Sequence, residues 1–541
     1  MNGIVKIPKP INEPVKVYAP GSAETQSLKS KLQEMKNNTV DIPMYINGKE
    51  VYSDEKITIH PPHEKNHTLG TYNKGNAKHI QDAIDAALAA KENWANMPWQ
   101  SRAAIFLKAA DLLAGPFRDR MNAATMLAQS KNAMQAEIDA ACEMIDFFKF
   151  NVQYMSEIYA QQPPENSPGV WNQLEYRPLE GFVFALSPFN FTSIAANLCS
   201  APAMMGNTVV WKPSETQIYS AQVIMELYKE AGLPDGVINL VYVDGPTTGD
   251  VIFNHRDFAG IHFTGSTGVF RHIWKTIGNN IEKYRSYPRI VGETGGKDFV
   301  MVHKSANVDA VNTALVRGSF EFQGQKCSAA SRAYIPESMW AELKPKLVAT
   351  TNSLKMGTTE DFTNYINAVI DQKAFNKITS FIAAAKEAND AEVIAGGDYD
   401  DSEGYFIRPT VIVAEDPKYS TMCEELFGPV LTLYVYKDSE YEQTLKMLDD
   451  TSEYALTGAI LCKDREQINV ALNALRNSAG NFYINDKPTG AVVGQQPFGG
   501  ARGSGTNDKA GAPANLMRWT SMRTIKETFV SPTSYEYPFH S

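Results

Sequence analysis

The chain has 541 residues, of which 43% are hydrophobic and 21% are charged. This length suits three or four ordinary domains, and this composition excludes a disordered or collagen-like chain. Asp and Glu outnumber Lys and Arg by 61 to 51, and the formal charge of −10 argues against nucleic acid as a partner, because nucleic-acid affinity rests on clustered cations.

The first predicted elements are helices. Residues 1–40 begin Pro-rich and become strongly charged, which predicts an arm that ends in a short helix. Apolar residues recur at helical spacing over residues 76–94, and further helices are predicted over 101–113 and 119–150. Prolines within residues 161–176 predict a break before the next strand.

From residue 181 short apolar strands alternate with amphipathic helices. Ser214, with Gln217 three residues later, predicts a capping box at the start of one helix, and Gly232 predicts its end. The alternation predicts a parallel sheet with right-handed crossovers. The predicted strands are Phe182–Leu186, Thr208–Lys212, Ile238–Tyr242 and Gly260–Phe263, and the helices are Thr192–Met205, Thr216–Ala231 and Asp250–His255.

The alternation restarts near residue 299, which predicts a second α/β unit. Its expected strands are Phe299–Val302 and Ala333–Ile335, and its expected helices are Asp309–Glu321 and Ala374–Glu387. The most apolar stretch, Gly181–Leu186, is strand-sized, so no membrane helix is expected.

The compartment is predicted from the N-terminal residues and the cysteines. The N-terminal residues lack an apolar core for secretion, and no Arg precedes Arg102, unlike an organelle transit peptide. The five cysteines are sparse and odd in number, which favours free thiols in a reducing compartment. We expect the cytoplasm, with the mitochondrial matrix as the alternative if the source is eukaryotic.

Two common ligand signatures are missing from the sequence. There is no GxGxxG dinucleotide fingerprint, and no spacing of Cys, His or carboxylate residues that would predict a metal site. The segment Gly292–Lys297 resembles a phosphate loop only superficially, because Asp298 stands where Ser or Thr would hold magnesium.

Two side chains stand out as candidates for chemistry. Cys327 follows Lys326 and precedes small residues, so a cation could lower the pKa of its thiol and a substrate could approach it. Glu293 lies among glycines that let the backbone approach a ligand and leave the side chain room to move, and as a general base it would need a pKa raised by a partly apolar site. Taken alone, each also fits a plain role: a half-buried structural thiol and a solvent-facing Glu in a turn.

Three segments follow predicted strands, where open α/β sheets bind ligands. Asn190 could donate to an oxyanion, and Lys212 and Glu215 suit ribose hydroxyls. The turn before Gly268 begins a helix, whose free N–H groups suit a pyrophosphate. Each signal is weak alone, because such turns are common in α/β proteins.

Together, these motifs resemble the aldehyde dehydrogenase superfamily over residues 42–526. The resemblance implies an α/β fold with a variant Rossmann domain for NAD, an α/β catalytic domain and a small oligomerisation sheet. The motifs that carry it are Ser187–Asn190, Lys212–Glu215, Phe263–Gly268, Glu293–Lys297, Gly324–Cys327 and Glu425–Pro429.

The resemblance implies a role for each of these residues. Cys327 would attack the aldehyde to give a thiohemiacetal and then a thioester, the Asn190 amide and the Cys327 N–H would hold the oxyanion, and Glu293 would activate the hydrolytic water. NAD would be preferred over NADP because Glu215 would repel a 2′-phosphate. The residues expected around the cofactor are Ser187, Lys212, Glu215, Gly265, Ser266, Thr267, Gly268, Val269, Glu425 and Phe427.

Two segments, Ala136–Phe148 and Gly490–Lys509, resemble the branch of the family that oxidises L-glutamate γ-semialdehyde to L-glutamate, the second step of proline degradation. Glu143 would pair with the substrate ammonium or with Lys326, and the alternative is a carboxylate on a helix surface. The substrate carboxylate and aliphatic stem would contact the backbone of Gly490 and Ala491, the Ser328 hydroxyl and the Phe498 ring.

The family architecture implies a domain division and a homodimer or larger homo-oligomer. Residues 1–40 would be an arm, 41–167 and 186–300 the NAD-binding domain, and 301–497 the catalytic domain. The oligomerisation elements would be 168–185 and 510–541, with strands within Trp171–Phe184 and Trp519–Val530.

Two other functions remain open from the sequence. A reductase of acyl phosphates or other activated acyl groups would share the fold and the Cys thioester, but a base at Glu293 would harm it by admitting water. A nucleotide-binding structural protein without activity is the other alternative, and the presence of Cys327, Glu293 and Asn190 argues against it.

Overall fold

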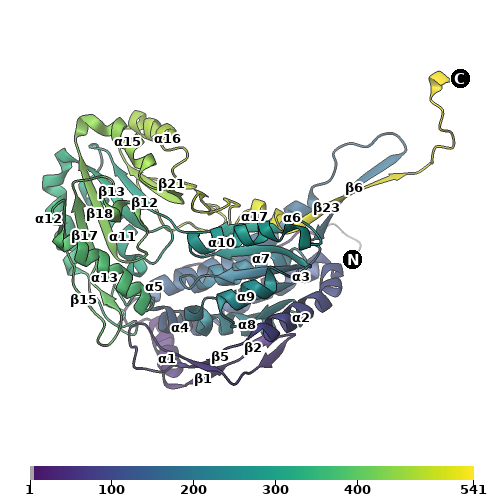
Figure 1. Cartoon of the computed structure of the whole chain (residues 1–541), viewed down its shortest axis with the longest axis horizontal. Helices are drawn as coiled ribbons and strands as arrows, with labels where there is room; N and C mark the ends of the chain where they lie inside the picture. The colour runs from purple at the N-terminus through teal and green to yellow at the C-terminus, as the bar shows by residue number, and fades with distance from the viewer. Residues whose placement is uncertain (1–4, 541) are drawn as a thin grey trace.

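The computed structural model describes residues 5–540 and contains two seven-stranded sheets, which confirms the predicted α/β fold class (Figure 1). The first sheet has the strand order β11 (Arg289–Glu293), β10 (Phe258–Thr264), β7 (Phe182–Ser187), β8 (Val209–Pro213), β9 (Ile238–Leu240), β2 (Met44–Ile46) and β3 (Lys49–Val51). The second has the order β14 (Ala391–Ala395), β17 (Thr410–Ala414), β18 (Val430–Tyr436), β13 (Ala330–Pro336), β12 (Asp298–Val302), β20 (Thr457–Leu461) and β21 (Asn481–Ile484).

The first sheet reverses its strand order beside β7. The chain runs outward from β7 through β8 to β9, and then returns to place β10 and β11 on the other side of β7. All these strands are parallel, so the connections that follow β7 and β10 leave the carboxyl edge toward opposite ends of the sheet, the place where open α/β sheets bind ligands.

The two sheets are joined by a short connection. Strand β11 ends at Glu293 and β12 begins at Asp298, so only residues 294–297 lie between the sheets. The carboxyl edge of the first sheet therefore faces the amino edge of the second. Because β12 already belongs to the second sheet, the change of sheet falls before the boundary that was predicted after residue 300.

Strand β12 shows how the second sheet is built. Val300 and Val302 pack into one apolar cluster, whereas Phe299 and Met301 pack into another. Successive side chains of a strand point to opposite faces, so a strand that is apolar throughout needs cover on both. The covering helices are α11 (Val308–Phe320), α12 (Glu337–Ser353), α13 (Gln372–Glu387), α15 (Tyr441–Asp450) and α16 (Arg465–Ala474).

The first sheet shares one continuous apolar core with the helices around it. Those helices are α2 (Ala77–Asn96), α3 (Trp99–Ala114), α4 (Arg118–Gln129), α5 (Ala133–Ala136), α6 (Met144–Ala160), α7 (Thr192–Met204), α8 (Ile218–Ala231), α9 (Gly245–Ile252) and α10 (Thr267–Asn279). Within residues 5–540, no helix combines the length and apolar character needed to cross a bilayer.

The long helix predicted over 119–150 is interrupted. Helix α4 ends at Ser130, which adopts a left-handed conformation with φ of 54°. The chain then resumes as α5, passes through a π-helical segment, Glu137–Glu143, and continues as α6 to Ala160. The apolar periodicity survives the break, which is why the sequence pattern did not reveal it.

Two predicted helix starts are also corrected. Ser214 does not cap helix α8, because its hydroxyl pairs with Thr216 while Gln217 bonds Ser187 and Phe191. Helix α9 begins at Gly245 rather than Asp250, since Asp244 accepts a hydrogen bond from the Thr247 N–H at 2.9 Å. That N-cap was readable in the sequence and was missed.

A two-stranded antiparallel ribbon projects from the body of the molecule (Figure 1). It pairs β6 (Val170–Pro178) with β23 (Thr520–Thr528) along their full lengths. The predicted segment to Phe184 was too long, because Phe182 begins β7 of the first sheet.

The predicted arm folds back onto the body of the molecule, where its helix contacts α4. Its helix, α1 (Ala23–Asn37), is longer than expected and buries Leu28 and Leu32. It leads into a small sheet with the order β1 (Val40–Ile42), β5 (Gly70–Asn73) and β4 (Lys56–Ile59).

Candidate functional site

Cys327 lies in a tight coil between α11 and β13. Phe322, Gln323 and Gly324 are all left-handed, with φ of 52°, 54° and 66°. Two consecutive residues other than glycine in this region are strained, and surrounding contacts must hold them there. The coil presents Cys327 half-buried at the amino edge of the second sheet.

Asn190 comes from the first sheet and contacts this coil. It follows β7, and its amide Nδ2 donates to the carbonyl of Gln325 at 3.1 Å. The candidate oxyanion donor and the candidate nucleophile, 137 positions apart in the chain, are thus brought to the same coil.

The connection between the sheets passes directly beside the nucleophile. A Cβ on Gly296 would lie 2.3 Å from the carbonyl oxygen of Cys327, and one on Gly295 would lie 2.3 Å from the Glu425 carboxylate. The Gly296 N–H donates to Glu425 at 2.8 Å. The two glycines are therefore needed for close approach, and they place Glu293, Cys327 and Glu425 around one short segment.

Glu293 ends β11 and is largely enclosed. A Cβ on Gly499 would lie 2.7 Å from its Oε1, and its Oε2 is buried without a hydrogen-bond partner among residues 5–540. Burial raises the pKa of Glu293 to about 8, although the nearby Lys509 opposes the shift. A carboxyl group poised near neutral pH suits a general base.

The thiol of Cys327 is not activated by the adjacent lysine, contrary to the sequence prediction. Lys326 points to Glu321, with 3.0 Å between Nζ and Oε2. Burial, with the charge of Glu293 as the next contribution, raises the pKa of Cys327 well above its ordinary value. The surroundings of the thiol therefore disfavour its ionised form.

The N-terminus of α10 provides donors for an anion. Ser266 does not cap the helix with its side chain, and among residues 5–540 the N–H groups of Thr267, Gly268 and Val269 have no acceptor. A Cβ on Gly268 would meet no atom within 4 Å. Gly265 donates its N–H to the Glu293 carbonyl, which anchors this turn beside β11.

The candidates at the end of β8 differ in their surroundings. Lys212 is buried, which lowers the pKa of its ammonium, while Glu215 and Asp244 oppose that shift. Glu215 is exposed. Ser187 differs from the expectation: its hydroxyl donates to Gln217 and accepts from Trp211, so that side chain is satisfied inside the core instead of facing a ribose.

Two aromatic rings line the junction of the two sheets. Phe427, with φ of 60°, packs edge-on against Phe189, which follows β7, with 5.8 Å between the ring centres. Glu425, two residues before Phe427, is half-buried, and the loss of solvent raises the pKa of its carboxyl group. Phe427 thus lies against the segment that follows β7.

The candidate substrate residues lie on a loop that starts beside the nucleophile. The Ser328 hydroxyl is 2.8 Å from that of Thr489, which precedes Gly490. Among residues 5–540, the N–H groups of Gly490 and Ala491 have no acceptor. Phe498, near the end of the loop, pairs with Ala510 through two backbone hydrogen bonds.

Glu143 does not meet its expected partner Lys326, which is engaged by Glu321. Ser193 instead donates to Glu143 at 3.0 Å. Burial and the charge of Asp139 raise the pKa of Glu143 to about 8.

A buried ion pair that sequence reasoning missed braces the site. Lys131 and Asp139 are 2.6 Å apart and both are 1% exposed. The Lys131 ammonium lies over the rings of Phe191 and Phe322, at 4.1 and 4.4 Å from their centres. The pair thus joins the segment after Asn190 to the coil before Cys327, and no sequence pattern announces it.

Lys487 was also missed. Its Nζ would lie 3.1 Å from a Cβ on Gly490, so a cation stands beside the free N–H groups of the loop. The position of Lys487, three residues before the glycine, was the available signal.

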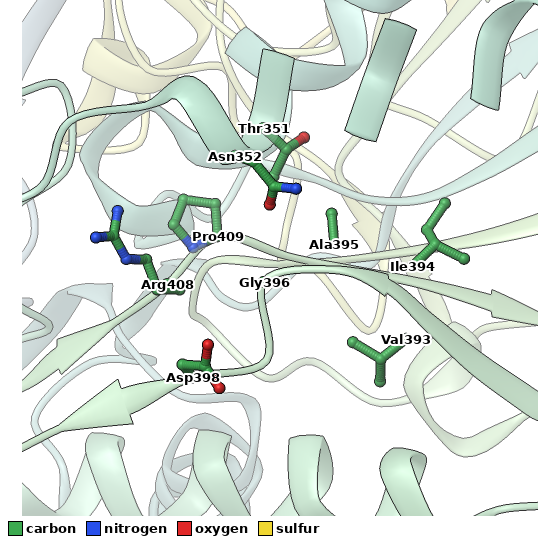
Figure 2. A pocket seen from close by; sticks show the side chains of 9 residues that line it. All are labelled: Thr351, Asn352, Val393, Ile394, Ala395, Gly396, Asp398, Arg408 and Pro409. Carbon is green, nitrogen blue, oxygen red and sulfur yellow. The ribbon is translucent and has the colours of Figure 1, made fainter. Parts of the chain in front are cut away.

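Other parts of the structure offer less chemistry. A hollow of about 400 Å³ lies at the β14 edge of the second sheet, and its lining includes the polar side chains of Thr351, Asn352, Asp398 and Arg408 (Figure 2). Within residues 5–540, no group of three or more His, Cys, Asp or Glu side chains could hold a metal ion.

Comparisons with known proteins match nearly the whole chain. The profile of the aldehyde dehydrogenase family matches residues 50–525. The mitochondrial delta-1-pyrroline-5-carboxylate dehydrogenase of Dictyostelium discoideum is 52% identical, over 98% of this chain and 96% of that protein. The mitochondrial enzyme of the same name from Homo sapiens is 45% identical, over 98% of this chain and 94% of that protein.

A solved structure resembles this one closely. The crystal structure of the delta-pyrroline-5-carboxylate dehydrogenase from Mycobacterium tuberculosis, bound with NAD, has a TM-score of 0.96 and 53% sequence identity. The match covers 100% of both chains.

Proposed function

The chain belongs to the aldehyde dehydrogenase family, and we propose that it oxidises L-glutamate γ-semialdehyde, the open form of delta-1-pyrroline-5-carboxylate, to L-glutamate with NAD. This reaction is the second step of proline degradation. The observation that carries the proposal is the convergence of Cys327, Asn190 and Glu293 around residues 294–297, with the unpaired N–H groups of Gly490 and Ala491 on the loop that begins beside the nucleophile.

The nucleophile in this reaction is the Cys327 sulfur. Its proton passes to the nearby Glu293 carboxylate, which later releases it to solvent; the sulfur attacks the aldehyde carbon, and the carbonyl oxygen becomes an oxyanion. The Asn190 amide and the Cys327 backbone N–H stabilise that charge, a type of contact that contributes about 3–4 kcal/mol per donor. The bond between Asn190 and the Gln325 carbonyl positions the amide on the nucleophile's coil.

The residues present fit NAD. The free N–H groups at the start of α10 suit its pyrophosphate, and Lys212 and Glu215 at the end of β8 suit a ribose. Bound there, NAD would supply the hydride acceptor that oxidation of the thiohemiacetal to the thioester on Cys327 requires. Glu425 and Phe427, from the second sheet, form one side of the same junction.

The thioester is hydrolysed with the help of Glu293. Its carboxylate takes a proton from water, the water oxygen attacks the thioester carbon, and the Cys327 sulfur leaves as the carboxylate product forms. The unpartnered Oε2 of Glu293 supports this role, because a buried acceptor is available for the water.

The substrate is recognised at the end opposite its aldehyde. Its α-carboxylate accepts from the N–H groups of Gly490 and Ala491, with the charge of Lys487 close by. Ser328 supports the loop through Thr489, and Phe498 packs on the aliphatic stem. We assign the substrate ammonium to the region of Glu143.

A substrate panel tests the proposal. Three aldehydes of equal length are compared with NAD and NADP: glutamate semialdehyde, 5-oxopentanoate without the ammonium, and pentanal without either charge. We expect NADH formation with a kcat/KM that falls in that order and is higher with NAD. If pentanal matches glutamate semialdehyde, the carboxylate subsite is wrong; if no aldehyde is oxidised, the activity itself is wrong.

The projecting ribbon supports a homodimer or larger homo-oligomer. An isolated two-stranded ribbon is marginally stable in water, and this one exposes Trp171 by 51% and Met522 by 55%. We propose that a second copy covers it. Light scattering on Trp171→Glu and Met522→Glu should show a smaller particle than the unchanged protein, and an unchanged mass would contradict the assignment.

We also propose a reducing compartment, which suits the free cysteines. The sequence favours the cytoplasm, and the names of the Dictyostelium and human relatives favour the mitochondrial matrix as the alternative.

A further inference from the structure

The loop between Thr489 and Phe498 is fixed firmly at its two ends. Its start is bonded to Ser328 beside the nucleophile, and its end is paired with Ala510 next to Lys509. Within the loop, the N–H groups of Gln495 and Gln496 both donate to the Val492 carbonyl. The Val492 N–H also donates to the Gln496 side chain at 2.9 Å, so these residues form one turn, and a contact from another segment can set where that turn lies.

That contact comes from the N-terminal arm. The Asn12 amide nitrogen donates to the Val493 carbonyl and to Asp146 on α6, both at 2.7 Å. The Asn12 amide oxygen accepts from Gln495 at 3.0 Å. One carboxamide thus uses both its donors and its acceptor to join three segments, the arm, α6 and the loop, that lie 134 and 481 positions apart in the chain.

The arm is itself held rigidly behind Asn12. The Glu13 N–H donates to Asp146 at 2.7 Å, and the Glu13 carboxylate pairs with Arg118 at 2.7 Å and with Lys149 at 3.1 Å. Arg118 is 3% exposed, so this pairing is sheltered from solvent.

The next residues of the arm repeat this pattern of attachment. The Lys16 N–H and the Tyr18 hydroxyl both donate to Glu137, at 2.9 and 2.8 Å. Glu137 opens the π-helical segment that ends at Glu143, and it also pairs with Arg118. The backbone around Asn12 is therefore held in place. The hydrogen bonds of Asn12 fix the position of the loop relative to α6.

We propose that Asn12 is a positioning residue for substrate specificity: it sets the loop so that the N–H groups of Gly490 and Ala491 meet the α-carboxylate of the aldehyde. The inference rests on the proposed function, because it assigns those N–H groups to the substrate carboxylate. It concerns binding at the far end of the substrate, and it leaves the chemistry at Cys327 unchanged.

The test compares Asn12→Ala with the unchanged full-length protein on two aldehydes, glutamate semialdehyde and pentanal. We expect the KM for glutamate semialdehyde to rise about five- to ten-fold with kcat within about two-fold, because a misplaced pair of donors weakens binding. The KM values for pentanal and for NAD should stay unchanged, since neither uses the carboxylate subsite.

A second variant guards against a folding defect. Gln495→Ala removes one bond of the junction and leaves the arm attached to Asp146, and it should raise the same KM by a smaller factor. In the double variant the two effects should be less than multiplicative, because both act through one contact. Gln26→Ala is the matched control and should change nothing, because this exposed amide further along the arm bonds the Gly21 carbonyl and no part of the loop among residues 5–540.

The outcomes separate the two proposals. Equal KM changes for both aldehydes, or no change for either, would overturn the positioning role. Failure of the proposed function appears instead in the unchanged protein, as an absent preference for glutamate semialdehyde over pentanal.

Discussion

The two sheet edges that meet at residues 294–297 offer different kinds of groups. The carboxyl edge of the first sheet presents exposed backbone donors at the start of α10, where Gly268 is open and Val269 is 47% exposed. The amino edge of the second sheet presents Cys327 in a buried coil, with the pKa of its thiol raised. Backbone donors bind an anion well while open to solvent, whereas reactive side chains need a sheltered site that shifts their protonation.

This comparison predicts that variants at the two edges fail differently. Those at the catalytic edge should lose turnover and keep cofactor affinity, and those at the cofactor edge should do the reverse.

The largest effect is expected for Cys327→Ala. Turnover should fall about 10⁵-fold or more, because no other group supplies the thioester. NAD affinity, measured by titration calorimetry, should stay within about two-fold. Retained turnover would show that Cys327 is not the nucleophile. A loss of NAD affinity would contradict the separation of roles between the two edges.

For Glu293→Gln, we expect a burst of one equivalent of NADH followed by steady turnover about 10²–10⁴-fold slower, because the amide cannot take a proton from water. Rapid-mixing absorbance at the NADH band measures both phases. Normal steady turnover would assign water activation to another group.

Asn190→Ala should lower kcat by about 10²–10³-fold, the usual loss for one oxyanion donor. Asn190 follows a strand of the first sheet, but its amide acts at the catalytic edge. The KM for NAD should therefore not change. Because this side chain also bonds Gln325, the melting temperature is recorded as a control. A rise in the KM for NAD alone would place Asn190 with the cofactor.

Hydrolysis of the thioester should depend on pH through Glu293. With a pKa of about 8, this carboxyl group is protonated and inactive as a base below that pH. The hydrolysis rate should therefore fall about tenfold per pH unit below 8 and level off above it. Single-turnover rates between pH 6 and pH 9 check this, and a rate that does not vary would show that the acting base titrates elsewhere.

The smallest effect is expected at the cofactor edge. Glu215→Gln should raise kcat/KM with NADP about five- to ten-fold and leave the value with NAD nearly unchanged, because it removes a charge that repels a 2′-phosphate. Steady-state kinetics with both cofactors measure the ratio. An unchanged ratio would move the source of cofactor preference away from Glu215.

The sequence predicted much of the architecture because its periodicity is strong. The alternation after residue 181 located β7, β8, β9 and β10 and the helices between them, and the ordered motifs identified the family. The break at Ser130 was hidden because one left-handed residue leaves the apolar pattern intact.

The contacts within the site were predicted less well, since they depend on partners distant in the chain. Lys326 was expected beside the thiol from adjacency alone, yet the coil turns it to Glu321. Likewise, neither Lys131 beneath two rings nor Asn12 against Val493 leaves a local signature. Adjacency in sequence is a poor guide where the backbone is left-handed.

The short connection at residues 294–297 also limits the distance between the two sheets. Four residues span at most about 14 Å, so the halves cannot separate far at that corner. This short tether keeps the Glu293 carboxylate close to the amino edge that presents the Cys327 sulfur.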